Sequence, residues 1–120
     1  MAIQKVTLDK KFNLFSEQWK PKIIAELNDS HVKIAKLKGD FVWHRHERED
    51  EMFLVMKGNL TIKLRDQNIT LKPGELVVIP KGVEHKPVAD EEVQLMMIEP
   101  KTTLNTGNVQ NERTALPEWI

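Results

Sequence analysis

Short runs of apolar and β-branched residues, separated by turn residues, dominate the chain from residue 22 onward. The runs cover residues 22–27, 32–37, 41–46, 51–56, 60–64, 69–71, 76–79, 83–88 and 93–98. Each run is typical of a β-strand. The segments between them are rich in Gly, Pro, Asn and Asp, which favour turns. Closely spaced short strands of this kind predict an all-β fold, an antiparallel sandwich or barrel.

The two ends of the chain follow other patterns. Near the N-terminus, apolar residues recur at helical spacing: Leu8, Phe12, Phe15 and Trp19. This spacing, with Pro21 after it, predicts a short amphipathic helix over about residues 9–19 that packs on the core. Residues 101–120 are mostly polar and read as an extended arm, whose apolar end we expect to dock on the body of the protein. We therefore expect one domain over residues 1–120, with the barrel core over about residues 22–100.

Two of the predicted strands lack alternation between apolar and polar residues. Residues 52–56 and 95–98 are apolar at consecutive positions, so both faces of these strands should be covered. In so small a protein a second subunit is the favoured cover, and we expect a homodimer. The alternative is that the N-terminal helix or the C-terminal arm covers the outer face.

Composition narrows the classes of function. The chain has 120 residues and its 18 Lys and Arg balance 18 Asp and Glu, so it lacks the basic surplus typical of a nucleic-acid-binding protein. Cysteine is absent, which excludes disulfides, catalytic thiols and thiolate metal sites. Neither a signal peptide nor a membrane-spanning run is recognised, so the cytoplasm is the expected location and no membrane partner is expected.

Histidines and carboxylates cluster in two short segments, 43–51 and 80–85. Side chains two apart in a strand share a face, so His44 and His46 can present two imidazoles to one point. Glu51 follows a four-residue loop and can reach the same point, and His85 from a later hairpin can complete the set. Three imidazoles and a carboxylate suit one divalent transition metal ion, such as iron, manganese, nickel, copper or zinc.

Other interpretations of these histidines and carboxylates stay open. A lone His-x-His pair usually faces solvent or joins a surface network. Asp50 is the alternative carboxylate ligand, because it stands one residue before Glu51. His31 shares its strand face with Lys33 and is interpreted as a solvated or structural histidine.

Both segments resemble the two motifs of the cupin superfamily. The first motif combines two glycines, a His-x-His pair and a glutamate, here Gly39, His44, His46, Glu51 and Gly58. The second combines two glycines, a proline and a histidine, here Gly74, Pro80, Gly82 and His85. The chain departs from the pattern in having four rather than five residues between Gly39 and His44, and in having Ala89 where the family has Asn.

The resemblance implies a small antiparallel β-barrel, or flattened jelly roll, with a metal ion inside it near one end. It implies that this ion is bound by His44, His46, Glu51 and His85. The reactions that the resemblance permits are dioxygenation, decarboxylation, and isomerisation of sugars or keto acids. Strand parity turns Arg45 and Glu84 away from the site, and the chain has no Tyr. A further acid or base is therefore missing, which favours metal-centred oxidation over isomerisation.

Two other functions stay open at this point. The barrel could be a non-catalytic module that binds a small molecule, with Val42, Phe53 and Val55 expected to line an apolar pocket. It could also be a purely structural β-domain without metal. The sequence alone identifies neither the metal nor the substrate.

Overall fold

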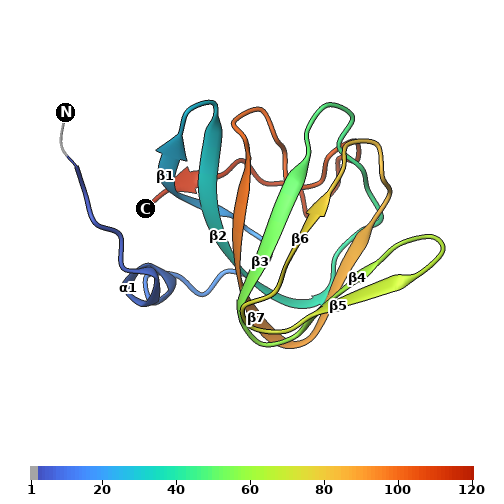
Figure 1. Ribbon diagram of the computed structural model, residues 1–120, viewed down its shortest axis with the longest axis horizontal. Helices are drawn as coiled ribbons and strands as arrows, with labels where there is room; N and C mark the ends of the chain where they lie inside the picture. Colours follow the sequence, from blue (N-terminus) through green and yellow to red (C-terminus); the bar gives the residue numbers. More distant parts are fainter. Residues whose placement is uncertain (1–2) are drawn as a thin grey trace.

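The computed structural model describes residues 3–120 as one short helix and eight strands (Figure 1). The elements, in chain order, are α1 (Leu8–Phe12), β1 (Lys22–Leu27), β2 (Ser30–Asp40), β3 (Glu51–Lys57), β4 (Leu60–Lys63), β5 (Asn68–Leu71), β6 (Leu76–Ile79), β7 (Lys86–Pro100) and β8 (Glu118–Trp119). The mostly-β fold class predicted from the sequence is confirmed. No helix in the described part of the chain is long and apolar enough to cross a bilayer.

The long strand β7 organises the sheet. It pairs with β2 over most of its length, with β4 near its start and with β3 toward its end. The main path runs β5-β4-β7-β2-β1-β8, and β6 pairs with β3 beside it. All pairs are antiparallel except β1 with β8. The hydrogen-bonded pairs among residues 3–120 do not close into a ring, so the two sides of the fold meet through side chains.

Alternating side chains of the central strands build the core. On β3 the buried residues are Glu51, Phe53 and Val55, and the residues between them are half-buried. On β7, Leu95 and Met97 are buried on the matching face. This regular alternation gives the sheet an apolar inner face on which the candidate site is built.

The predicted N-terminal helix is shorter than expected. The structure ends it at Phe12, and Phe12 packs with Ile24 and Ile34 on the outer side of the sheet. Trp19 instead adopts a positive φ of 63° and enters the inner core, where it stacks on Phe41 with ring centroids 4.8 Å apart. The apolar residues with helical spacing therefore serve two separate clusters, which one continuous helix could not reach.

The prediction for residues 41–46 was also wrong in detail, because they form no regular strand. The Phe41 amide donates to the Pro87 carbonyl at 2.9 Å, whereas His44 pairs with His85. The three steps from Phe41 to His44 thus face only two steps, from Pro87 to His85, on the opposing segment, and the strand pairing is interrupted there. Residues 83–88 and 93–98, predicted as two strands, are largely joined in β7, which bulges at residues 90–92 opposite the register shift between Leu37 and Gly39.

The C-terminal arm docks as expected. Strand β8 pairs with β1, the Ile120 amide donates to the Ile23 carbonyl at 3.1 Å, and the Lys11 ammonium donates to the Ile120 carbonyl at 2.8 Å. Figure 1 shows the C-terminus lying beside β1, close to α1. The arm therefore returns to the N-terminal end of the sheet after crossing the region of the site.

The outer face of the sheet is apolar across four strands. Val78, Met52, Ile98 and Val32 oppose one another in one row of the register, and Leu76, Leu54, Met96 and Ile34 form the next. Segments near the two chain ends cover Ile34 and part of Met96. Leu76 and Val78 remain 56% and 50% exposed. The N-terminal segment and the end of the C-terminal arm thus cover one half of this face, as the alternative to a second subunit predicted.

Candidate metal centre

Two imidazoles of the predicted cluster are positioned by a backbone bridge. The His44 amide donates to the His85 carbonyl at 3.0 Å, and the His85 amide donates back at 2.9 Å. Their ring centroids lie 4.3 Å apart. The His46 carbonyl accepts a hydrogen bond from the Gly82 amide at 2.8 Å. The segment between β6 and β7, which carries His85 and is not the hairpin expected from the sequence, therefore also holds the His46 backbone.

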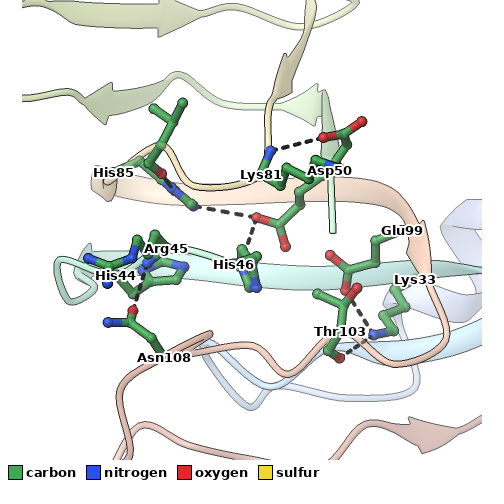
Figure 2. Close-up of polar contacts among 12 residues, drawn as sticks. Lys33, His44, Arg45, His46, Asp50, Lys81, His85, Glu99, Thr103 and Asn108 are labelled. Atoms are coloured by element: carbon green, nitrogen blue, oxygen red, sulfur yellow. Dashed lines mark hydrogen bonds and ion pairs between the residues drawn. The ribbon is translucent and has the colours of Figure 1, made fainter. Parts of the chain in front are cut away.

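Glu51, the first residue of β3, faces these imidazoles. Its Oε1 lies 3.3 Å from Nε2 of His46 and 3.5 Å from Nε2 of His85. Dashed lines in Figure 2 mark both contacts at the labelled histidines. His44, His46, Glu51 and His85 are all 3% exposed or less. One donor atom from each lies within 4.8 Å of the others. The structure thus brings together all four residues singled out in the sequence.

Hydrogen bonds set the orientation of two of the rings. Nδ1 of His44 lies 2.8 Å from the Val42 carbonyl and Nδ1 of His85 lies 3.0 Å from the Val83 carbonyl. A ring that donates from Nδ1 leaves a lone pair on Nε2, which is the form that binds a metal. Nε2 of His85, both ring nitrogens of His46 and Oε1 of Glu51 have no hydrogen-bond partner among residues 3–120. Such buried atoms without partners fit a group that could hold a metal ion.

The electrostatics of the cluster favour a neutral His44 imidazole beside a charged Glu51 carboxylate. Burial, together with the neighbouring His85, lowers the pKa of His44 to about 4. Burial alone would raise the pKa of Glu51, but the adjoining Glu99 carboxyl and the imidazoles outweigh it and hold this pKa well below its ordinary value. Near neutral pH His44 and Glu51 are therefore in the protonation states that bind a metal ion.

One buried carboxyl beside the cluster was missed in the sequence. Glu99 on β7 is 2% exposed, and its Oε1 accepts from the ammonium of Lys33, itself 1% exposed, at 2.8 Å. Burial and the nearby Glu51 carboxyl raise the pKa of Glu99 well above its ordinary value. Strand parity was the signal that could have found it, since Glu99 shares the inward face of Leu95 and Met97.

The other sequence candidates lie outside the cluster. Oδ1 of Asp50 accepts from the Lys81 amide at 2.9 Å, at an exposed position (Figure 2). His31 lies with its Nε2 3.7 Å from a Glu26 carboxylate oxygen and its ring edge-on to Trp119. Neither side chain belongs to the buried group of possible metal ligands in the described chain.

Two cavities adjoin the cluster on different sides. The inner one has a volume of about 40 Å³ and is lined by His44, Glu51 and Glu99 together with mainly apolar side chains, among them Trp19, Phe41 and Phe53. Of the three residues expected to line a pocket, Phe53 does so, whereas Val42 and Val55 are not part of this wall. The second cavity, of about 190 Å³, lies beside His46 and is lined largely by the charged 47–49 loop and the C-terminal arm.

The C-terminal arm is fastened to the segment that carries two of the imidazoles. Asn108 accepts from the Arg45 amide through Oδ1 at 2.9 Å and donates from its own amide to the Arg45 carbonyl at 3.0 Å. Gly107 packs so closely that a Cβ there would overlap the Arg45 carbonyl oxygen. Asn105 lines the inner cavity and donates to the Trp19 carbonyl at 3.4 Å. The arm therefore forms part of the wall of the site.

Comparison with family models identifies most of this region. A model described as "Cupin domain" matches residues 30–99. The uncharacterized protein YdbB of Bacillus subtilis (strain 168) is 39% identical over 64 residues, which cover 52% of this chain and 57% of that protein. The chain thus spans little more than half the length of this relative.

Solved structures show the same fold. A cupin-2 domain containing protein from Shewanella frigidimarina is 56% identical with a TM-score of 0.78, over 79% of this chain and 93% of that chain. Protein NMB1881 from Neisseria meningitidis is 28% identical with a TM-score of 0.75, over 81% and 99%. KdgF from Halomonas sp. is 27% identical with a TM-score of 0.59, over 67% and 78%.

Proposed function

Because the chain belongs to the cupin family, we propose that it holds one divalent transition metal ion through four side chains, namely His44, His46, Glu51 and His85. The convergence of these buried donor atoms within 4.8 Å carries the proposal. Three imidazole nitrogens and one carboxylate oxygen suit iron, manganese, nickel or zinc. A bound cation would also supply the partner that the buried lone pairs of the cluster lack.

We propose that the protein is a small-molecule metalloenzyme, with dioxygenase-type oxidation as the favoured reaction. A metal ion with four protein ligands keeps positions free for a small oxygen-containing molecule, which it polarises and orients. Aromatic side chains of the chain shape the surroundings of this cluster. Phe41, Phe53 and Trp19 make one side of the cluster's surroundings apolar, and low local polarity strengthens the charge interactions within the cluster.

Isomerisation of a sugar or keto acid is the second candidate, and one observation favours it. The sequence pointed to no acid or base beyond the ligand set, but the Glu99 carboxyl lies in the wall of the inner cavity. A carboxyl in this position can accept or return a proton on a bound molecule. A non-catalytic module that binds a small molecule is the remaining alternative.

Metal content tests the first part of the proposal. Protein purified without added metal is expected to contain about one transition metal ion per chain by elemental analysis. The Glu51→Gln variant should lose it, whereas Asp50→Asn, a matched change on the neighbouring residue, should keep it. The opposite pattern would assign the carboxylate ligand to Asp50.

Turnover tests the second part. We expect the metal-loaded protein to consume oxygen with a member of a panel of catechols, flavonoids and enediols. Isomerisation of sugars or keto acids without oxygen uptake would favour the second candidate. A full complement of metal without turnover of any compound would favour the binding module.

We also propose that a second copy of the chain covers the open half of the outer sheet face. The uncovered part of the two cross-strand rows is apolar, including Met52, Leu54, Leu76 and Val78. An apolar face of this kind can pack against the same face of a second copy, which is the form that a two-fold contact takes. Sedimentation equilibrium should give a mass near 28 kDa, twice the 13.9 kDa of one chain, and a monomer at every concentration would refute the dimer.

A further inference from the structure

The inner cavity has one polar pole away from the imidazoles. Its wall is apolar except at a few positions, and Glu99 is part of this wall together with Leu95, Met97 and Ala35. Figure 2 shows Glu99 beside Lys33 and Thr103, to one side of the imidazoles. Lys33 reaches both the Glu99 Oε1 at 2.8 Å and the Thr103 carbonyl at 3.4 Å. The carboxyl is therefore held in one orientation by strands and arm together.

The second oxygen of this carboxyl lacks a hydrogen-bond donor. Oε2 of Glu99 is buried and has no hydrogen-bond partner within residues 3–120. A buried acceptor left without a donor costs about 1–3 kcal/mol, and buried ion pairs such as Lys33 with Glu99 are poor contributors to stability compared with apolar side chains. An arrangement that is costly for folding, in the wall of a cavity next to a candidate metal centre, fits a role in binding.

We propose that Glu99 is a specificity-determining residue that accepts a hydrogen bond from a hydroxyl group of the ligand in the inner cavity. The inference rests on the proposed function in one respect, since the oxyanion end of the same ligand would meet the metal ion. The ligand class is a short hydroxy acid: one oxyanion, one hydroxyl and a small apolar connection between them.

The charges around Glu99 favour a neutral hydroxyl over an ammonium group. The ammonium of Lys33 lies 2.8 Å from the Glu99 carboxyl and already supplies a positive charge there. A metal ion held by Glu51 and His44 would add more positive charge along the same wall. A second cation in this cavity would therefore be repelled, whereas a hydroxyl adds no charge.

The size of the cavity limits the length of the ligand. Its volume is about 40 Å³, on a scale where one water needs about 10–15 Å³. A molecule of only a few heavy atoms fits without movement of the arm. This bound directs the choice of probes to hydroxy acids of two to four carbons.

Pairs of acids with equal numbers of heavy atoms test the inference. The probes are glycolate against propionate, 3-hydroxypropionate against butyrate and 4-hydroxybutyrate against valerate, with 3-aminopropionate as the cationic counterpart. Each is titrated into cobalt-loaded protein and followed by the visible absorption of the metal and by calorimetry. At least one hydroxylated probe should bind about three- to tenfold more tightly than its partner, which is the net worth of about one hydrogen bond formed in competition with water.

Variants separate Glu99 from the metal centre. In Glu99→Leu the hydroxyl preference should fall to about onefold, and in Glu99→Gln, which keeps an acceptor oxygen, part of it should remain. The Lys33→Met/Glu99→Leu double variant repeats the measurement without a buried unpaired ammonium. Glu84→Leu is the matched control, because Glu84 pairs with Arg65 outside the inner cavity and its loss should leave the preference intact.

The two proposals fail differently in this experiment. A wild-type protein that takes up no cobalt would overturn the metal centre. Full cobalt binding without a hydroxyl preference in any pair, without binding of any hydroxylated probe, or with tighter binding of 3-aminopropionate would overturn the role of Glu99 alone. A preference that survives in both variants lacking the carboxyl would do the same.

Discussion

Replacing Gly107 by alanine probes how firmly the C-terminal arm braces the site. A Cβ at this position would overlap the carbonyl oxygen of Arg45 and lie 2.9 Å from its carbonyl carbon and 3.3 Å from Cδ2 of His44. Backbone atoms cannot rotate away as a side-chain tip can, so the arm or the 44–46 segment must shift. Overpacking of this kind costs about 1–3 kcal/mol, and the positive φ of 55° adds on the order of 1 kcal/mol for a residue with a Cβ.

Gly74→Ala is the control for this change. Gly74 also has a positive φ, of 84°, but a Cβ there meets nothing within 4 Å, so only the conformational cost of about 1 kcal/mol is expected. Urea unfolding of the metal-free proteins should therefore show a larger loss of unfolding free energy for Gly107→Ala, by about 1–3 kcal/mol. Metal affinity should weaken in the same variant, because the shift moves His44. Equal losses in both variants, within about 0.5 kcal/mol, would refute the bracing role of the arm.

Three further results are expected from the buried groups. In the metal-free protein the pKa of His44 lies near 4, below the free value of about 6.5, so the unfolded state binds more protons between these pH values. The contribution of His44 to the free energy of unfolding, about 3 kcal/mol, should therefore be lost as the pH falls from about 6.5 to about 4. Urea unfolding of wild type and His44→Gln should show this difference in pH dependence, and parallel curves would contradict it. Lys33→Met should lower the free energy of unfolding by roughly 3–5 kcal/mol, because it leaves Glu99 buried without its cation. The double variant Lys33→Met/Glu99→Leu should recover most of this loss, and an equally unstable double variant would argue against the pairing. Zinc at about a hundredfold over its dissociation constant should stabilise wild type by about 2.7 kcal/mol in calorimetry, and an equal gain in Glu51→Gln would contradict its role as ligand.

The local pattern of the sequence was sufficient for several strands and for the four residues that the structure brings together in the cluster. Strand β1 matches the predicted range 22–27, because alternation and turn residues bound it on both sides. His44 and His46 were paired by assuming a regular strand. The segment is only extended, yet their rings come within 5.1 Å of each other, since an extended backbone has nearly the same side-chain periodicity. The backbone hydrogen bonds between His44 and His85 hold this segment in place, as a full strand pairing would have done.

Features that depend on distant contacts could not be read in the same way. Residues 90–92 are three exposed acids, a composition typical of a turn, but pairing with β2 on both sides of the bulge carries β7 straight through them. Strand parity places Glu99 on the inward face, but its cation, Lys33 on β2, is brought to it by the pairing of β2 with β7, which local pattern does not reveal. The C-terminal arm has no periodic pattern of apolar residues. Its position is set by hydrogen bonds to distant residues, which local pattern does not reveal.

The arm also links the two chemical ends of the inner cavity. At one end, Gly107 and Asn108 press on the backbone next to His44, and at the other the Thr103 carbonyl accepts from Lys33, which orients Glu99. A shift of the arm therefore changes the position of an imidazole and the orientation of the carboxyl at once. Metal affinity and ligand selectivity are for this reason expected to be coupled, since the same short segment fixes the geometry on which each depends.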